Sequence, residues 1–154
     1  MNEKVYSTKT HSISRTEYCE NTFSLTINFF ELSFEVDTYK LTDVFGYFPL
    51  IKAIKTKIFI PQYNKGDYCI RLNNQNIKSG EIYNYNDIAY TEGVDFKNSR
   101  IYYDTSNKII CIGEIDYKHM GIKINDYIVC VLDQKGILRC LYIMFDRIEW
   151  LSIP

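Results

Sequence analysis

The sequence lacks the patterns that usually mark a catalytic or metal site. Its seven glycines are scattered and form no Gly-rich phosphate-binding loop. There are only two histidines, His11 and His119, and neither belongs to a His-x-x-x-His or Cys-x-x-Cys metal spacing. We therefore predict no catalytic residues, no metal and no cofactor, and we expect a protein that is not an enzyme.

Three titratable residues come closest to a reactive set. Glu114 and Asp116 stand two positions apart, so on a strand they would share a face and could act as general acid and base. The same spacing is common on solvent-exposed strand faces, which is the interpretation we favour. An enzyme would need a cleft in which Glu114, Asp116 or His119 converge, and this hypothesis ranks last.

Close cysteine pairs and long apolar runs are also missing. The five cysteines are odd in number and widely spaced, which argues against a disulfide framework and fits a reducing compartment. No stretch approaches the ~20 apolar residues of a membrane span, and the N-terminus has no apolar signal-peptide stretch. We expect a cytoplasmic protein that does not contact membranes, and the abundance of Ile, Asn, Lys and Tyr hints at a bacterial or phage source.

The residues that are present fit one β-rich domain. The chain has 154 residues, of which 46% are hydrophobic and 24% charged, so it can bury a core without cross-links. Aromatic residues reach 16%, with 14 Tyr and 9 Phe, and such residues pack well in sheets. We expect a single domain over residues 1–154, with the polar segment 1–21 loosely ordered.

Hydrophobic patterns predict most of the elements. Apolar residues alternate from Thr22 onward, and the phase reverses at Phe29 and Phe30, which predicts a bulge in one bent strand or two strands that meet there. An apolar helical face after Thr42 predicts one short helix around residues 42–56, which Pro49 would divide. Further strands are predicted over residues 57–60, 68–72, 81–90 and 147–153.

Two hairpins in the C-terminal third share one turn pattern, Asp-x-x-Asn or Asp-x-x-Gly. Their turns are residues 104–107 and 133–136. Pairing in the second hairpin would set Cys130 opposite Cys140, where a redox switch is conceivable, although we favour two reduced, buried thiols. The whole pattern predicts a mainly β (α+β) fold, either a curved antiparallel sheet or a partly open barrel or sandwich, with the short helix against it.

Charge is uneven along the chain although the net charge is only −1. Residues 50–80 hold six bases and one acid, whereas residues 81–107 hold five acids and two bases. The basic segment also contains Phe59, Tyr63 and Tyr68 and could bind nucleic acid, but the overall charge opposes this. A solvated surface would explain the same lysines.

The acidic segment is the predicted partner surface, because it combines carboxylates with tyrosines. Tyr is common at interface hot spots, and carboxylates orient a basic partner. The opposing interpretation is that the tyrosines pack inward and the acids only solubilise the protein. Tyr83, Tyr85 and Asp87 would share one strand face. The predicted partner-binding residues are Glu81, Tyr83, Tyr85, Asp87, Tyr90, Glu92, Asp95, Tyr102 and Tyr103.

Residues 112–114 (Ile-Gly-Glu) and 121–129 (Gly-Ile-Lys-Ile-Asn-Asp-Tyr-Ile-Val), followed by a hairpin, resemble a segment of immunity proteins, which guard bacteria against polymorphic or contact-dependent toxins. The resemblance covers about a third of the chain and implies no catalytic residues. It implies a cytoplasmic protein that binds and neutralises a cognate toxin, often a basic nuclease. An acidic surface would suit such a partner. The alternative is a small-ligand or nucleic-acid-binding β domain that uses residues 50–80.

Overall fold

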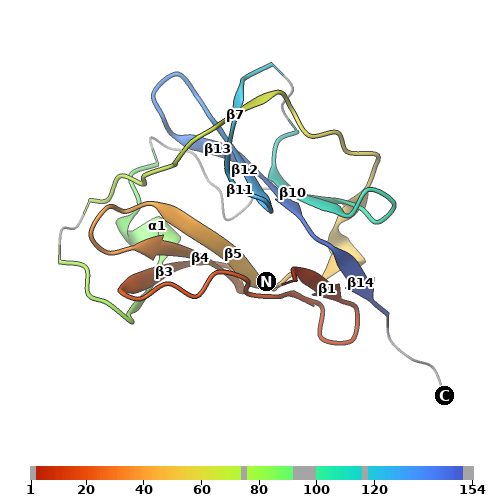
Figure 1. The fold of residues 1–154 in the computed structure, drawn as a ribbon, viewed down its shortest axis with the longest axis horizontal. Coiled ribbons are helices and arrows are strands. Elements are labelled where there is room, and N and C mark those ends of the chain that lie inside the picture. The colour runs from red at the N-terminus through yellow and green to blue at the C-terminus, as the bar shows by residue number, and fades with distance from the viewer. Residues whose placement is uncertain (1–2, 74–75, 92–99, 116–117, 151–154) are drawn as a thin grey trace.

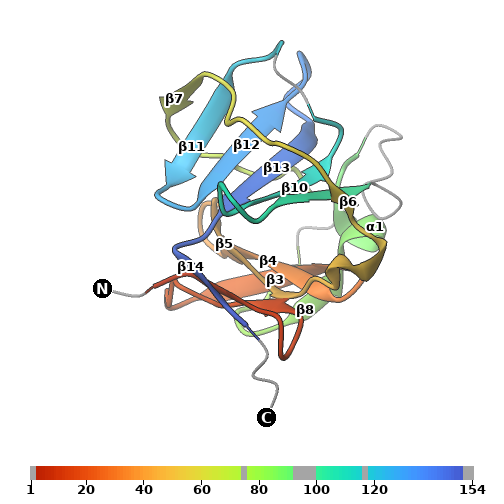
Figure 2. The same ribbon diagram turned by 90° about the vertical axis from the view of Figure 1, so that its right-hand side faces the viewer.

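The fold is a sandwich of two mixed β-sheets (Figures 1 and 2). The computed structural model describes residues 3–73, 76–91, 100–115 and 118–150. The first sheet has the order β14 (Arg147–Glu149), β1 (Val5–Ser7), β2 (Ser12–Ile13), β5 (Leu41–Tyr47), β4 (Phe30–Glu35), β3 (Thr22–Ile27), β8 (Ile82–Asn84). The second has the order β6 (Ile54–Lys55), β9 (Ile101–Asp104), β10 (Ile109–Gly113), β13 (Leu138–Met144), β12 (Ile128–Leu132), β11 (Gly121–Asn125), β7 (Tyr63–Lys65). This confirms the predicted β-rich fold class.

The main core lies between the two sheets and follows from the alternation in the strands. Leu25 and Leu32 point inward from the first sheet, and Ile112, Leu141 and Ile143 meet them from the second. All five side chains are almost completely buried, so the removal of apolar surface from water drives the packing of the two sheets. Among the described residues, no helix is long and apolar enough to cross a membrane.

The phase reversal at residues 29 and 30 marks a tight hairpin between β3 and β4. Ile27 pairs directly with Phe30, and Asn28 and Phe29 form the turn, with Asn28 at a φ of 55°. Residues that pair across antiparallel strands point to the same face, so both Ile27 and Phe30 are buried. The expectation of two strands that meet there is confirmed, and the turn signal is the single Asn.

The helix predicted around residues 42–56 is wrong in its extent. Residues 41–47 form β5, which pairs with β2 and β4, and only Leu50–Lys52 makes a single 3-10 turn, η1. Pairing with two neighbouring strands overrides the weak helical pattern, and Gly46 lies at a φ of +117°, outside the helical region. Pro49 then stands directly before the 3-10 turn, where its missing N–H costs nothing.

The strand predicted over residues 81–90 is also shorter than expected. β8 ends at Asn84, whose side chain accepts a hydrogen bond from the N–H of Asn86 and starts the four-residue helix α1 (Tyr85–Ile88). Tyr83, Tyr85 and Asp87 therefore do not share one strand face. The other two central predictions become extended chain: residues 57–60 form no strand, and residues 68–72 make only isolated bridges.

The segment 1–21, which the sequence predicted to be loose, contributes β1 and β2 to the first sheet. The Lys4 side chain is fully buried, and its Nζ lies 2.7 Å from Oδ1 of Asp43, which is also fully buried. Oδ2 of Asp43 accepts hydrogen bonds from the N–H groups of Thr16 and Glu17. This network fixes both ends of the N-terminal segment against β5.

A strap of residues 56–62 covers the outer face of the second sheet and joins β6 at one edge to β7 at the other (Figure 2). From Lys55 to Tyr63 the chain can reach at most about 29 Å, and six interstrand spacings of a flat sheet measure about 29 Å. The strap therefore runs extended and turns Ile58 inward, onto a second apolar cluster on this face. Both faces of β12 and β13 are thus covered, which is why both are apolar.

The predicted pairing of Cys130 with Cys140 is wrong by one residue. Cys130 pairs with Leu141, and Cys140 pairs with Val131, because the register shifts between Val131 and Leu132, next to the turn. A one-residue shift places the two cysteines on opposite faces of the sheet. Cys140 instead lies near Cys111, with 3.2 Å between the two sulfur atoms.

Candidate functional site: an apolar pocket with an aromatic rim

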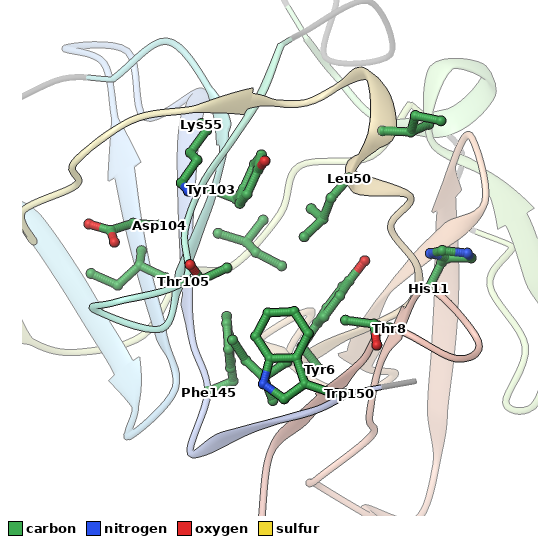
Figure 3. A pocket seen from close by; sticks show the side chains of 14 residues that line it. Tyr6, Thr8, His11, Leu50, Lys55, Tyr103, Asp104, Thr105, Phe145 and Trp150 are labelled. Atoms are coloured by element: carbon green, nitrogen blue, oxygen red, sulfur yellow. The ribbon is translucent and has the colours of Figure 1, made fainter. Parts of the chain in front are cut away.

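A pocket of about 310 Å³ is lined by residues of β1 and β14 from the first sheet and of β9 and β10 from the second (Figure 3). Tyr6 of β1 and Phe145, which follows β13, form its floor together with Ile110 of β10. Leu50 of η1 and Tyr103 of β9 form the opposite wall. The lining comes from segments far apart in the sequence, and most of it is apolar.

The rim of the pocket exposes large apolar side chains. Ile51 is 91% exposed and Trp150 is 66% exposed, and both line the pocket. His11 also lines the pocket, and its ring makes an edge contact with the ring of Tyr47. The Tyr47 ring in turn makes an edge contact with the ring of Phe29, with 5.8 Å between the two ring centres. Phe29 is itself 75% exposed. Ring contacts thus connect the pocket rim through His11 and Tyr47 to the exposed Phe29, and exposed apolar groups that gather in this way mark interaction surfaces.

The polar groups of the pocket wall hold structure in place. The Tyr6 hydroxyl donates a hydrogen bond to the carbonyl of Phe48, 2.5 Å away. Burial, with the neighbouring Tyr47 and Tyr103 hydroxyls, raises the pKa of Tyr6 to about 12, so Tyr6 stays a protonated donor. Lys55 is exposed and lines the pocket, and it supplies a cation there.

Asp104 also borders the pocket, but its carboxylate ties the strap to the β9–β10 turn. Oδ2 accepts hydrogen bonds from the N–H of Ile58 at 2.9 Å and from Nδ2 of Asn107 at 2.8 Å, and Oδ1 accepts one from the N–H of Asn107. Burial raises the pKa of Asp104, but these hydrogen bonds outweigh it and hold the pKa below its ordinary value. The Asp104 carboxylate is therefore ionised, and both of its oxygens already accept hydrogen bonds, which makes it a poor proton acceptor.

Removal of the Asp104 carboxylate is expected to loosen the strap. Asp104→Ala leaves the N–H of Ile58 buried without an acceptor, at a cost of about 1–3 kcal/mol in the free energy of unfolding. Urea denaturation measures this loss, and Asp126→Ala, at an exposed position, is the control with a change under about 0.5 kcal/mol. Because the folded-state pKa is lowered, the contribution of Asp104 is present above the unfolded pKa of about 4 and is lost as the pH falls through the folded value. Equal acid sensitivity of wild type and Asp104→Ala would contradict this role.

The structure separates the residues that the sequence grouped as one partner surface. Glu81, Asp87 and Tyr90 are exposed around β8 and α1, at the edge of the first sheet opposite to β1 and β14 (Figure 1). In the same region Tyr85 is only 2% exposed, and Tyr83 packs against the core with its ring near Phe23. Tyr83 and Tyr85 thus pack inward, whereas Tyr90 and the carboxylates of Glu81 and Asp87 face solvent.

The remaining predicted residues lie elsewhere. Tyr103 lines the pocket, whereas its neighbour Tyr102 packs on the outer face of the second sheet with the strap cluster. Glu92 and Asp95 lie outside the described residues. Of the seven predicted residues that the structure describes, only Tyr103 lines the pocket, and the sequence did not identify Tyr6, Ile51 or Trp150.

The other candidates from the sequence do not form a reactive centre in the described part of the chain. Hydrogen bonding with Cys140 and burial raise the pKa of the Cys111 thiol, and burial raises that of Cys130, so these thiols are poor nucleophiles. Glu114 and His119 are exposed, and Asp116 lies outside the described residues. The described residues contain no group of three or more His, Cys, Asp or Glu side chains that could hold a metal ion.

Comparison with known proteins gives no match, either to a protein-family model or to a curated protein sequence. The function must therefore be inferred from the pocket and the surfaces around it. The resemblance of residues 112–129 to immunity proteins stays a hypothesis that rests on the sequence.

Proposed function

We propose that this protein is a non-enzymatic binding protein, and specifically an immunity protein that neutralises a cognate toxin by seating an apolar side chain of the toxin in the pocket. The observation that carries the proposal is the apolar pocket with its exposed rim of Ile51 and Trp150. Interface hot spots are aromatic or apolar anchors that fill such pockets at the centre of a contact area. The assignment to immunity proteins rests on the sequence resemblance, and the choice of the binding site rests on the geometry of the pocket.

The extent of the apolar surface favours a protein partner over a small ligand. The pocket volume of about 310 Å³ lies at the lower limit for small-molecule sites, which range over about 300–1,000 Å³. The exposed apolar surface continues beyond the pocket, past His11 and Tyr47 to Phe29. A small ligand would leave these rings in water, whereas a partner surface would cover them.

The charge around the pocket also bears on the partner. Lys55 lines the pocket, and the carboxylate of Asp104, which also lines it, is taken up by hydrogen bonds. The carboxylates of Glu81 and Asp87 lie at the far edge of the first sheet. Complementary charge guides association, so the part of the toxin that meets this rim is neutral or acidic. The basic partner expected from the sequence would instead have to bind at β8 and α1.

Co-expression tests the proposal directly. Where a toxin domain is encoded beside this chain, that domain is expressed with wild type, with Ile51→Glu or with Trp150→Ala, and cell survival and co-purification are measured. Each substitution is expected to weaken binding by more than about 2 kcal/mol, or roughly thirtyfold, because it truncates or charges an anchor. Phe59→Ala is the matched control, since Phe59 is a 57% exposed aromatic residue on the strap.

Three outcomes would contradict the proposal. If Ile51→Glu and Trp150→Ala both protect as wild type does, the pocket is not the contact surface. If Glu81→Lys and Asp87→Lys abolish protection while the pocket variants keep it, the acidic surface predicted from the sequence is the contact surface. Survival without co-purification would exclude inhibition by direct binding.

A further inference from the structure

The strap and its flanks form an exposed cationic stripe on the second sheet. The sequence contains no Asp or Glu between Asp43 and Asp67. In the same interval four lysines are exposed, and none of them forms an ion pair with another described residue. They are Lys52, Lys55, Lys57 and Lys65. Positive charge is thus concentrated in this interval, although the whole chain has a net charge of −1.

Aromatic rings are interleaved with these lysines. Phe59 is 57% exposed and Tyr63 is 42% exposed. The ammonium of Lys57 lies 5.1 Å from the centre of the Phe59 ring, and that of Lys123, from β11, lies 5.3 Å from the centre of the Tyr63 ring. An exposed ring next to a cation offers a stacking surface and a phosphate contact side by side.

The extended backbone of the strap keeps these groups facing outward. Ile58 and Pro61 are buried against the sheet, so Lys57 and Phe59 on either side of Ile58 must point to solvent. The N–H of Ile58 is held by Asp104, which fixes the strap at this point. Lys57 and Phe59 thus lie on an extended segment that crosses the sheet from edge to edge (Figure 2).

We propose that this stripe is a binding surface for single-stranded nucleic acid. The lysines would contact successive phosphates, and Phe59 and Tyr63 would stack on bases, which is sequence-tolerant because every base has a π-face. An acidic protein would satisfy the lysines but would not need exposed rings placed between them. The surface is separate from the apolar pocket except at Lys55, so it does not depend on the proposed immunity function.

Fluorescence anisotropy of the full-length protein with labelled oligo-dT of about 12 nucleotides tests this proposal. Four phosphate contacts give a slope of log K against log salt of about −2.8, so binding weakens about 50-fold between 50 and 200 mM salt. In the double variant Lys57→Ala/Lys65→Ala the slope falls to about −1.4. Phe59→Ala weakens binding at least about fivefold with an unchanged slope, because a stacking contact is lost and no charge is removed.

Matched controls lie on the first sheet. Lys9→Ala removes an exposed lysine from the β1–β2 turn, and Phe29→Ala removes an exposed aromatic ring, so both are expected to bind oligo-dT as wild type does. Thermal unfolding of each variant confirms that it is folded. The proposal is overturned if oligo-dT does not bind at low salt, if Phe59→Ala has no effect, or if the protein is retained on heparin without binding oligo-dT. The last result would indicate a surface for an acidic protein.

Discussion

Lys4→Met is expected to lower the free energy of unfolding by about 3–5 kcal/mol. Nζ of Lys4 donates hydrogen bonds to Oδ1 of Asp43 at 2.7 Å and to the carbonyl of Ser14 at 2.9 Å, and no part of either charged side chain reaches solvent. Burial lowers the pKa of Lys4, and the charge of Asp43 opposes part of that decrease. Without the ammonium, the buried carboxylate has no counter-charge, which is the source of the loss.

Chemical denaturation, monitored by circular dichroism, measures this loss of stability, and two further variants serve as controls. Glu3→Gln breaks the exposed ion pair between Glu3 and Arg147 and should cost less than about 1 kcal/mol. The double variant Lys4→Met/Asp43→Leu replaces the buried pair by apolar groups and should recover most of the stability. A loss below about 1 kcal/mol for Lys4→Met alone would mean that the pair is not buried as described.

The same network links stability to the proposed binding site. Lys4 precedes β1, from which Tyr6 reaches the floor of the pocket, and Thr8 lines the pocket just beyond β1. If the network opens, the strand that positions these residues loses its anchor on β5. Lys4→Met is therefore also expected to weaken partner binding, although Lys4 itself does not line the pocket.

The strands that the sequence predicted well are those in which local pattern and tertiary contact agree. Strict alternation located β3 and β4, and the Asp-x-x-Asn and Asp-x-x-Gly turns located the hairpins β9–β10 and β12–β13. Each of these depends on neighbours within a few residues, which a single sequence reveals. β12 and β13 lie inside the second sheet, between β10 and β11, in agreement with the apolar character of both their faces.

The features that the sequence did not predict depend on contacts between distant segments. Lys4 and Asp43 are 39 positions apart, and no local pattern indicates that a lysine in a polar leader is buried. The pocket brings together residues from both ends of the chain, such as Tyr6 and Trp150. The single tryptophan of the chain, Trp150, is the one feature of the sequence that points to the pocket, because Trp is enriched at the hot spots of binding surfaces.

The acidic segment illustrates a different limit. Composition correctly placed carboxylates and tyrosines together, but the turn at Asn84 rotates Tyr85 into the core and leaves Asp87 outside. The alternation of aromatic and polar residues favours a strand here, although Asn84 is a good helix N-cap and the polar residues Asn86 and Asp87 follow it closely. Side-chain direction, rather than composition, decides whether such residues can bind a partner.

Gly113→Ala is expected to destabilise the protein by about 2–6 kcal/mol, a large effect for one added methyl group. Gly113 lies at a φ of +101°, where a residue with a Cβ is strained by about 1–3 kcal/mol. Its Cβ would overlap the carbonyl oxygen of Arg139 and lie 3.2 Å from Cα of Cys140. Both atoms belong to the backbone of β13, a central strand, so relief requires β10 and β13 to separate, at a further cost of about 1–3 kcal/mol.

Gly80→Ala separates the two causes. Gly80 lies at a similar φ of +82°, but a Cβ there would meet nothing within 4 Å, so only the backbone strain remains. Chemical denaturation should therefore show a clearly larger loss for Gly113→Ala than for Gly80→Ala, and equal losses would exclude the clash with β13. Because Ile109 and Ile110 of β10 line the pocket, movement of β10 away from β13 should also weaken partner binding, whereas Gly80→Ala should leave binding unchanged.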